Sequence, residues 1–165
     1  MLPQRKHPRL KKFDYSSPGA YFVTICTDRR KKMFCTVEKG QNGINNDLIH
    51  LTSYGEIVDA EIKAISNRFG LVDISRYVIM PNHIHLLIEI RRGENVSTPS
   101  PAITDMICML KSIVTRKIKT IGFKDKVFQT SFYEHIIRNK NDYEQTVKYI
   151  LENPINWYYD ELYVD

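Results

Sequence analysis

The segment from Arg76 to Ile90 places the tightest constraint on the fold. It reads Arg-Tyr-Val-Ile-Met-Pro-Asn-His-Ile-His-Leu-Leu-Ile-Glu-Ile, and its second half carries apolar side chains at positions 84, 86, 88 and 90. Successive side chains of a strand point to opposite faces, so this alternation predicts a strand with one face against a core. A second core strand over residues 72–80 would precede it, across a turn at Pro81 and Asn82. The chain therefore has to form a sheet with a buried face.

His83 and His85 point the same way in this pattern, away from the apolar row, and Leu87 and Glu89 continue their line. Two imidazoles side by side on a strand form half of a site for a divalent metal. A pair of surface histidines on a half-exposed strand is the plainer interpretation. Choosing between the two requires a third ligand and a nucleophile elsewhere in the chain.

The other segments predict an α+β fold. Strands are predicted over 21–27, 33–37 and 132–137, and helices over 53–69, 103–118 and 142–152. Residues 33–37 would return as a short partner of the first strand, and Ser53 with Glu56 would form a capping box. One antiparallel sheet with helices packed on one face fits this order, as in a ferredoxin-like (RRM-like) single domain over residues 1–165. Residues 1–15 would be a basic arm and 93–101 a linker loop.

Composition is that of an ordinary globular protein. The 165 residues are 42% hydrophobic and 26% charged, enough for one domain with a real core. No apolar run approaches the roughly 20 residues that cross a bilayer, and the N-terminus lacks the apolar stretch of a signal peptide. Cys26, Cys35 and Cys108 are an odd number without close spacing, so neither a disulfide framework nor a zinc knuckle is expected. A cytoplasmic protein with reduced thiols is predicted.

Basic residues are clustered in a chain of net charge +5 and pI near 9.0. The clusters are Arg5, Lys6, Arg9, Lys11 and Lys12, then Arg29, Arg30, Lys31 and Lys32, then Lys111, Arg116, Lys117 and Lys119. Such clusters suit a polyanion, most simply nucleic acid. A solvated charged face explains any one of them equally well.

The last predicted helix carries two tyrosines in different settings. At about 100° per residue, Tyr143, Val147 and Ile150 share the face expected to be buried. Tyr149 lies on a flank of that face, and Asn153 follows one turn later on the same flank. A hydroxyl and a carboxamide are therefore presented together, although a half-buried aromatic residue is the plainer interpretation of Tyr149 alone.

Several segments resemble those of single-tyrosine HUH transposases, most closely the REP-associated tyrosine transposases. They are Tyr21-Phe-Val-Thr-Ile-Cys-Thr27, Tyr77-Val-Ile-Met-Pro-Asn-His-Ile-His85, Leu110-Lys-Ser-Ile-Val-Thr115, Phe132-Tyr-Glu-His-Ile-Ile-Arg138 and Tyr149-Ile-Leu-Glu-Asn-Pro154. The similarity runs in order from about Arg9 to Trp157. His-x-His alone is a weak signal, whereas the Pro-Asn-His-x-His strand followed by the two later blocks is a strong one.

The resemblance implies that His83 and His85 ligate a divalent metal, Mg²⁺ or Mn²⁺, with Asn153 as third ligand and Tyr149 as nucleophile. It implies cleavage and rejoining of single-stranded DNA beside a hairpin, through a covalent 5′-phosphotyrosine, by a monomer or homodimer. His135 is expected to be structural.

Two other functions remain open from the sequence. A non-catalytic ferredoxin-like module that binds single-stranded nucleic acid would explain the charge and the fold, but not Tyr149 and Asn153 on one flank. A metal-dependent phosphoesterase is disfavoured, because enzymes built on paired His-x-Thr/Ser motifs need two of them.

Overall fold

β1 (Gly19–Cys26) and β5 (His83–Ile90) are the central strands of a four-stranded antiparallel sheet with the order β4-β5-β1-β6. The computed structural model describes residues 13–38, 49–93 and 101–165. Its other elements are β2 (Cys35–Val37), β3 (Ile49–Leu51), α1 (Ser53–Lys63), α2 (Ile65–Arg68), β4 (Val72–Ile79), α3 (Ile103–Thr120), β6 (Tyr133–Ile137), α4 (Lys140–Glu152) and the 3₁₀ turns η1 (Asp28–Arg30) and η2 (Trp157–Tyr159). This strand order is that of a split βαβ sheet, so the predicted α+β, ferredoxin-like class is confirmed.

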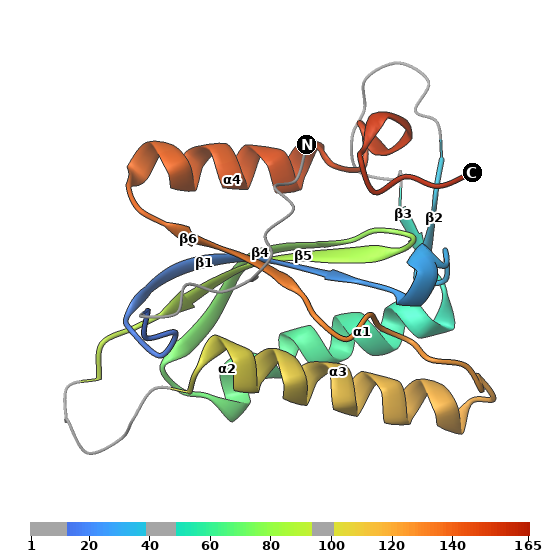
Figure 1. Ribbon diagram of the computed structural model, residues 1–165, viewed down its shortest axis with the longest axis horizontal. Helices are drawn as coiled ribbons and strands as arrows, with labels where there is room; N and C mark the ends of the chain where they lie inside the picture. The colour runs from blue at the N-terminus through green and yellow to red at the C-terminus, as the bar shows by residue number, and fades with distance from the viewer. Residues whose placement is uncertain (1–12, 39–48, 94–100) are drawn as a thin grey trace.

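The sheet is covered on both faces. Helices α1, α2 and α3 lie below it in Figure 1, and α4 lies above it. The apolar row Ile84, Leu86 and Ile88 packs in the same cluster as α1 and α3, as the alternation predicted. Leu87 points the other way, into a second cluster with Ile150 of α4 and Trp157. The prediction that the helices share one face is thus corrected for α4, because this sheet face also carries apolar side chains that need cover.

His83 and His85 are buried, with 0% and 2% of their surface exposed. They lie on the α4 face of β5, opposite the large core, as the alternation predicted. The half-exposed strand of the plainer interpretation is wrong, because α4 and the segment after it close over this face. Two imidazoles held away from water need partners, which makes their contacts informative.

The short strand β2 pairs with β3 and not with β1, contrary to the prediction. β1 already has neighbours on both sides, β5 and β6, so its hydrogen-bonding groups are taken.

The N-cap of α1 lies one residue before the predicted cap, Ser53. Thr52 is the N-cap, and its hydroxyl accepts a hydrogen bond from the Gly55 N–H. The Thr52 N–H donates to the carbonyl of Phe34, so a capping box with Glu56 is not needed. A Cβ on Gly55 would come within 2.0 Å of that same carbonyl, which explains the glycine. Within the described residues, no helix has the length and apolar character to cross a bilayer.

Candidate active site

His83 is held in one tautomer by Asn82. The Asn82 Nδ2 donates to the Leu162 carbonyl at 2.7 Å, which turns its Oδ1 toward His83 Nδ1 at 2.8 Å. A carboxamide oxygen can only accept, so Nδ1 of His83 is the donor. Burial lowers the pKa of His83 to about 4, against the opposing effects of Asp160 and Asn153. The ring is therefore neutral near pH 7 and its Nε2 carries a lone pair.

Asn153 presents its oxygen to that lone pair. Its Nδ2 donates to Asp160 Oδ2 at 2.8 Å, and its Oδ1 lies 3.2 Å from His83 Nε2. Both facing atoms are acceptors when His83 is neutral, so the pair is repulsive unless a cation lies between them. Asn153, the predicted third ligand, thus lies next to the histidines with its amide oxygen facing His83.

His85 offers a second free donor atom. Its Nδ1 hydrogen-bonds the Thr24 hydroxyl at 2.8 Å, across the paired strands β1 and β5. Its Nε2 is buried and has no hydrogen-bond partner within the part of the chain that the structure describes. Burial, with a smaller effect from His83, holds the pKa of His85 well below its ordinary value. Buried polar atoms normally have a partner, so a neutral imidazole nitrogen with a free lone pair at this position fits a metal ligand.

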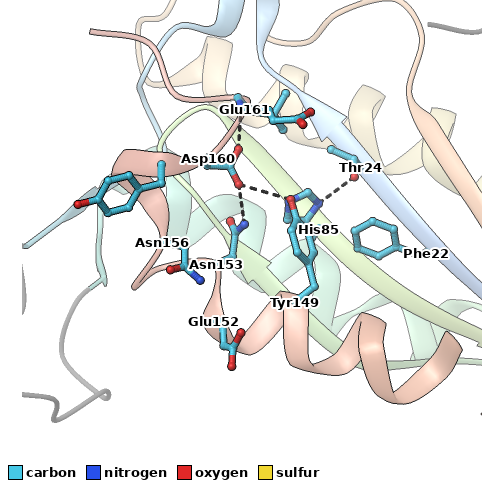
Figure 2. A pocket seen from close by; sticks show the side chains of 11 residues that line it. Phe22, Thr24, His85, Tyr149, Glu152, Asn153, Asn156, Asp160 and Glu161 are labelled. Carbon is cyan, nitrogen blue, oxygen red and sulfur yellow. Dashed lines mark hydrogen bonds between the residues drawn. The ribbon is translucent and has the colours of Figure 1, made fainter. Parts of the chain in front are cut away.

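Asp160 completes the group, and the sequence did not reveal it. One ligand atom from each of His83, His85 and Asp160 lies within 4.8 Å of the others. The Leu162 N–H donates to Asp160 Oδ1 at 2.7 Å and fixes the carboxylate (Figure 2). Two imidazoles and a carboxylate at this spacing fit a divalent metal.

Tyr149 of α4 lies beside the two histidines. Its hydroxyl is 3.4 Å from Asp160 Oδ2, its ring centroid is 5.2 Å from that of His85, and 44% of its surface is exposed. Burial and the Asp160 carboxylate raise the pKa of Tyr149 to about 12, so the phenol is protonated near pH 7. Tyr143 instead donates to Glu89 at 2.6 Å, in keeping with the packing role predicted for it.

A pocket of about 320 Å³ opens next to this group (Figure 2). Its walls are Phe22, Thr24, His85, Tyr149, Glu152, Asn153, Asn156, Tyr159, Asp160, Glu161 and Leu162. The exposed part of Tyr149 therefore faces a cavity that a substrate can enter.

Relatives of the chain carry transposase names. No protein-family model matches it. A Haemophilus influenzae protein without a functional name is 33% identical, with 99% of this chain and 96% of the relative covered. A REP-associated tyrosine transposase of Escherichia coli is 26% identical over 86% of this chain and 69% of its own length. The chain is thus similar to REP-associated tyrosine transposases, the branch that its motifs indicated.

The fold of this chain has solved counterparts. A structure described as a REP-associated tyrosine transposase bound to a REP hairpin matches with a TM-score of 0.64 at 20% identity, covering 93% of this chain and 76% of the other. A transposase structure from Deinococcus radiodurans matches with a TM-score of 0.51 at 14% identity, covering 88% and 98%. At these identities the likeness supports the fold.

Two of the three basic clusters lie within the described residues, and the first lies outside them. Arg5, Lys6, Arg9, Lys11 and Lys12 lie outside the described residues. In the second cluster, Arg30 Nη1 donates to the carbonyl of Glu161, next to Asp160, at 3.2 Å. Arg29 is exposed, whereas Lys31 pairs with Asp125 and Lys32 lies over Tyr163.

The third basic cluster lies on α3, across the sheet from α4, the helix that carries Tyr149 (Figure 1). Lys117 is bound to the buried Glu61, and Lys111 donates to the carbonyls of Gln129 and Thr130. Arg116 and Lys119 line a groove of about 740 Å³ between α3 and residues 124–130. Lys117 is thus a structural residue, and the groove is the basic surface of this helix.

Two residues at the site had no role from the sequence. Asp160 follows Pro154 and the turn η2, so no helical or strand period connects it to Tyr149. Asn82 belongs to the Pro-Asn-His motif, where an amide next to a predicted metal-binding histidine was the available signal. His135 hydrogen-bonds Asp142 in the first turn of α4, which agrees with the structural role expected for it.

Proposed function

We propose that this protein cleaves and rejoins single-stranded DNA in a metal-dependent reaction, with Tyr149 as nucleophile. The observation that carries the proposal is a group of hydrogen-bond acceptor atoms beside Tyr149 that have no donor to bind. Neutral His83 and the Asn153 oxygen point at each other across 3.2 Å, and the Nε2 of His85 is buried without a partner among the described residues. A bound cation would give the lone pairs of all three atoms a partner.

His83, His85 and Asn153 would hold the divalent metal, with Asp160 as orienting partner or additional ligand. A bound Mg²⁺ or Mn²⁺ would supply Lewis-acid stabilisation of the scissile phosphate. The protein prepares the site by fixing the His83 tautomer through Asn82 and the Asn153 amide through Asp160. Imidazoles are softer than Mg²⁺ prefers, so affinity without DNA should be modest.

Tyr149 would attack the phosphorus while its proton passes to the Asp160 carboxylate, its hydrogen-bond acceptor. The new bond joins the phenolic oxygen to the 5′ phosphate, and the bond to the 3′ oxygen breaks. That oxygen takes a proton from solvent and leaves as a free 3′-hydroxyl. Attack by another 3′-hydroxyl reverses these steps and rejoins a strand without ATP, since the covalent bond stores the energy.

DNA would be held by the basic residues on both sides of the sheet. Arg29 to Lys32 lie at the end of β1, near the site, whereas Arg116 and Lys119 lie on the far helix layer. A relative with the same fold is described in complex with a REP hairpin, which supports a hairpin beside the cut. The basic arm over residues 1–15 and the linker over 93–101 remain predictions, as does the choice between monomer and homodimer.

The proposal is tested by incubating the protein with labelled single-stranded DNA from its own genomic flanks and Mn²⁺, followed by denaturing electrophoresis. A protein–DNA adduct that needs both metal and Tyr149 is expected. Tight binding without an adduct under any metal would favour a non-catalytic module that binds single-stranded nucleic acid.

A further inference from the structure

The pocket beside Tyr149 is acidic, although the chain as a whole is basic. Its walls include the carboxylates of Glu152, Asp160 and Glu161, and no lysine or arginine is among its lining residues. Carboxylates repel phosphates, so the basic residues behind the net charge of +5 have to bind the DNA backbone at other surfaces. Apart from the scissile phosphate, which has to reach Tyr149 and which the proposed metal would neutralise, the backbone of a bound strand therefore passes outside this pocket, and an uncharged group enters it.

The same pocket has surfaces that suit a planar ring. Phe22 and Tyr149 meet edge to face with centroids 5.9 Å apart, and Tyr149 is 44% exposed. Exposed aromatic rings are the platforms on which unpaired bases stack. The volume of about 320 Å³ lies within the range of small-ligand sites.

We propose that this pocket holds the base of the nucleotide whose 5′ phosphate becomes joined to Tyr149, and that it prefers a base with an exocyclic amino group. The inference rests on the proposed function, because it assumes Tyr149 as nucleophile. Only the phosphate and the sugar separate the phenolic oxygen from that base, so the base lies within reach of the Tyr149 ring and of the pocket that this ring lines.

Glu152 provides the preference. It stands one turn before Asn156, whose backbone N–H donates to the Glu152 carbonyl at 3.0 Å, so a carboxylate and a carboxamide line the same wall. A carboxylate only accepts hydrogen bonds, and adenine, cytosine and guanine offer it an amino group. Thymine has one ring N–H between two carbonyls, and the carboxylate repels the oxygens of both carbonyls. The ion pair of Glu152 with Lys148 is long, 3.8 Å, and leaves the carboxylate available.

The test compares DNA strands that differ only in the base directly 3′ of the mapped cut. Adduct formation by the wild-type protein should be about tenfold slower with thymine or an abasic site than with the best amino-bearing base. In Glu152→Gln the carboxamide can donate as well as accept, so the disadvantage of thymine should shrink while that of the abasic site persists.

Glu144→Gln is the matched control. Glu144 also lies on α4 and also pairs with the lysine four residues before it, but it does not line this pocket. It should keep the wild-type base preference. Equal rates with all four bases and the abasic site would overturn the inference, as would the same loss of preference in both variants. No adduct with any strand would overturn the proposed function itself, a distinct result.

Discussion

At the scale of single residues, Tyr149 differs from the other tyrosine of α4 in what its hydroxyl meets. The hydroxyl of Tyr149 faces Asp160 and the pocket, whereas that of Tyr143 is bound to Glu89. Tyr149→Phe should abolish the adduct with little loss of DNA binding, because only one oxygen is removed. Electrophoresis and fluorescence anisotropy on one hairpin strand measure the two effects. Tyr143→Phe is the control and should form the adduct, since its hydroxyl lies away from the pocket walls.

Asp160 should control how well the site binds metal. Its carboxylate turns the Asn153 amide so that the oxygen faces His83. Asp160→Ala should weaken Mn²⁺ binding by about tenfold or more, as loss of a group that orients a metal ligand does. Asp160→Asn keeps an acceptor for the Asn153 Nδ2, so its affinity for Mn²⁺ should fall less. Electron paramagnetic resonance of Mn²⁺ without DNA gives both affinities, and an unchanged affinity in Asp160→Ala would remove this role.

At the scale of elements, the sequence predicted what local periodicity controls. The alternation around His83 and the helical spacing in α3 depend on near neighbours, and both were confirmed. The partner of β2, the face covered by α4 and the approach of Asp160 depend on contacts between distant segments. Such contacts depend on which strand edges and apolar faces are already occupied by other segments. Local patterns in a single sequence do not reveal this occupancy.

The packing of α1 on α3 depends on a buried carboxylate. Glu61 is 2% exposed and binds Lys117 of α3 and Arg68 of α2. Burial raises the pKa of Glu61, but the hydrogen bonds from Lys117 and Arg68 outweigh it and hold the pKa below 4.5. A carboxyl group with a lowered folded-state pKa stabilises the fold above its unfolded pKa. That stabilisation is lost as the pH falls through the folded-state pKa.

Glu61→Gln should therefore lower the free energy of unfolding by about 2 kcal/mol near neutral pH, because two charge-assisted hydrogen bonds weaken. The difference from wild type should narrow as the pH falls below the unfolded-state pKa and through the lowered folded-state pKa of Glu61, because the carboxyl group then becomes protonated in both states. Urea unfolding near neutral pH and at acidic pH measures this. Glu144→Gln removes an exposed pair and should change little. A deficit of the same size at both pH values would show that charge is not the cause.

At the scale of the whole molecule, α3, which lines the basic groove, and α4, which carries Tyr149, lie on opposite sides of the sheet (Figure 1). Arg116, Lys119 and Lys124 line the groove, and none of them has an ion pair or side-chain hydrogen bond within the described ranges. Cations without partners on a groove are the ones free to bind phosphates. DNA that reaches both the groove and Tyr149 has to pass around the edge of the sheet.

Arg116→Ala and Lys119→Ala should each weaken hairpin binding and reduce the slope of log affinity against log salt concentration by about 1, because each removes one phosphate contact. Neither change should alter the rate of adduct formation at saturating DNA, since α3, which carries both residues, lies across the sheet from α4, which carries Tyr149. Lys117→Ala is the comparison on the same helix. Its ammonium group is held by Glu61, so it should lower stability and leave the salt slope unchanged. Equal salt slopes in all three variants and the wild type would mean that DNA does not enter the groove, and that the α3 charges serve only to hold the helix layer together.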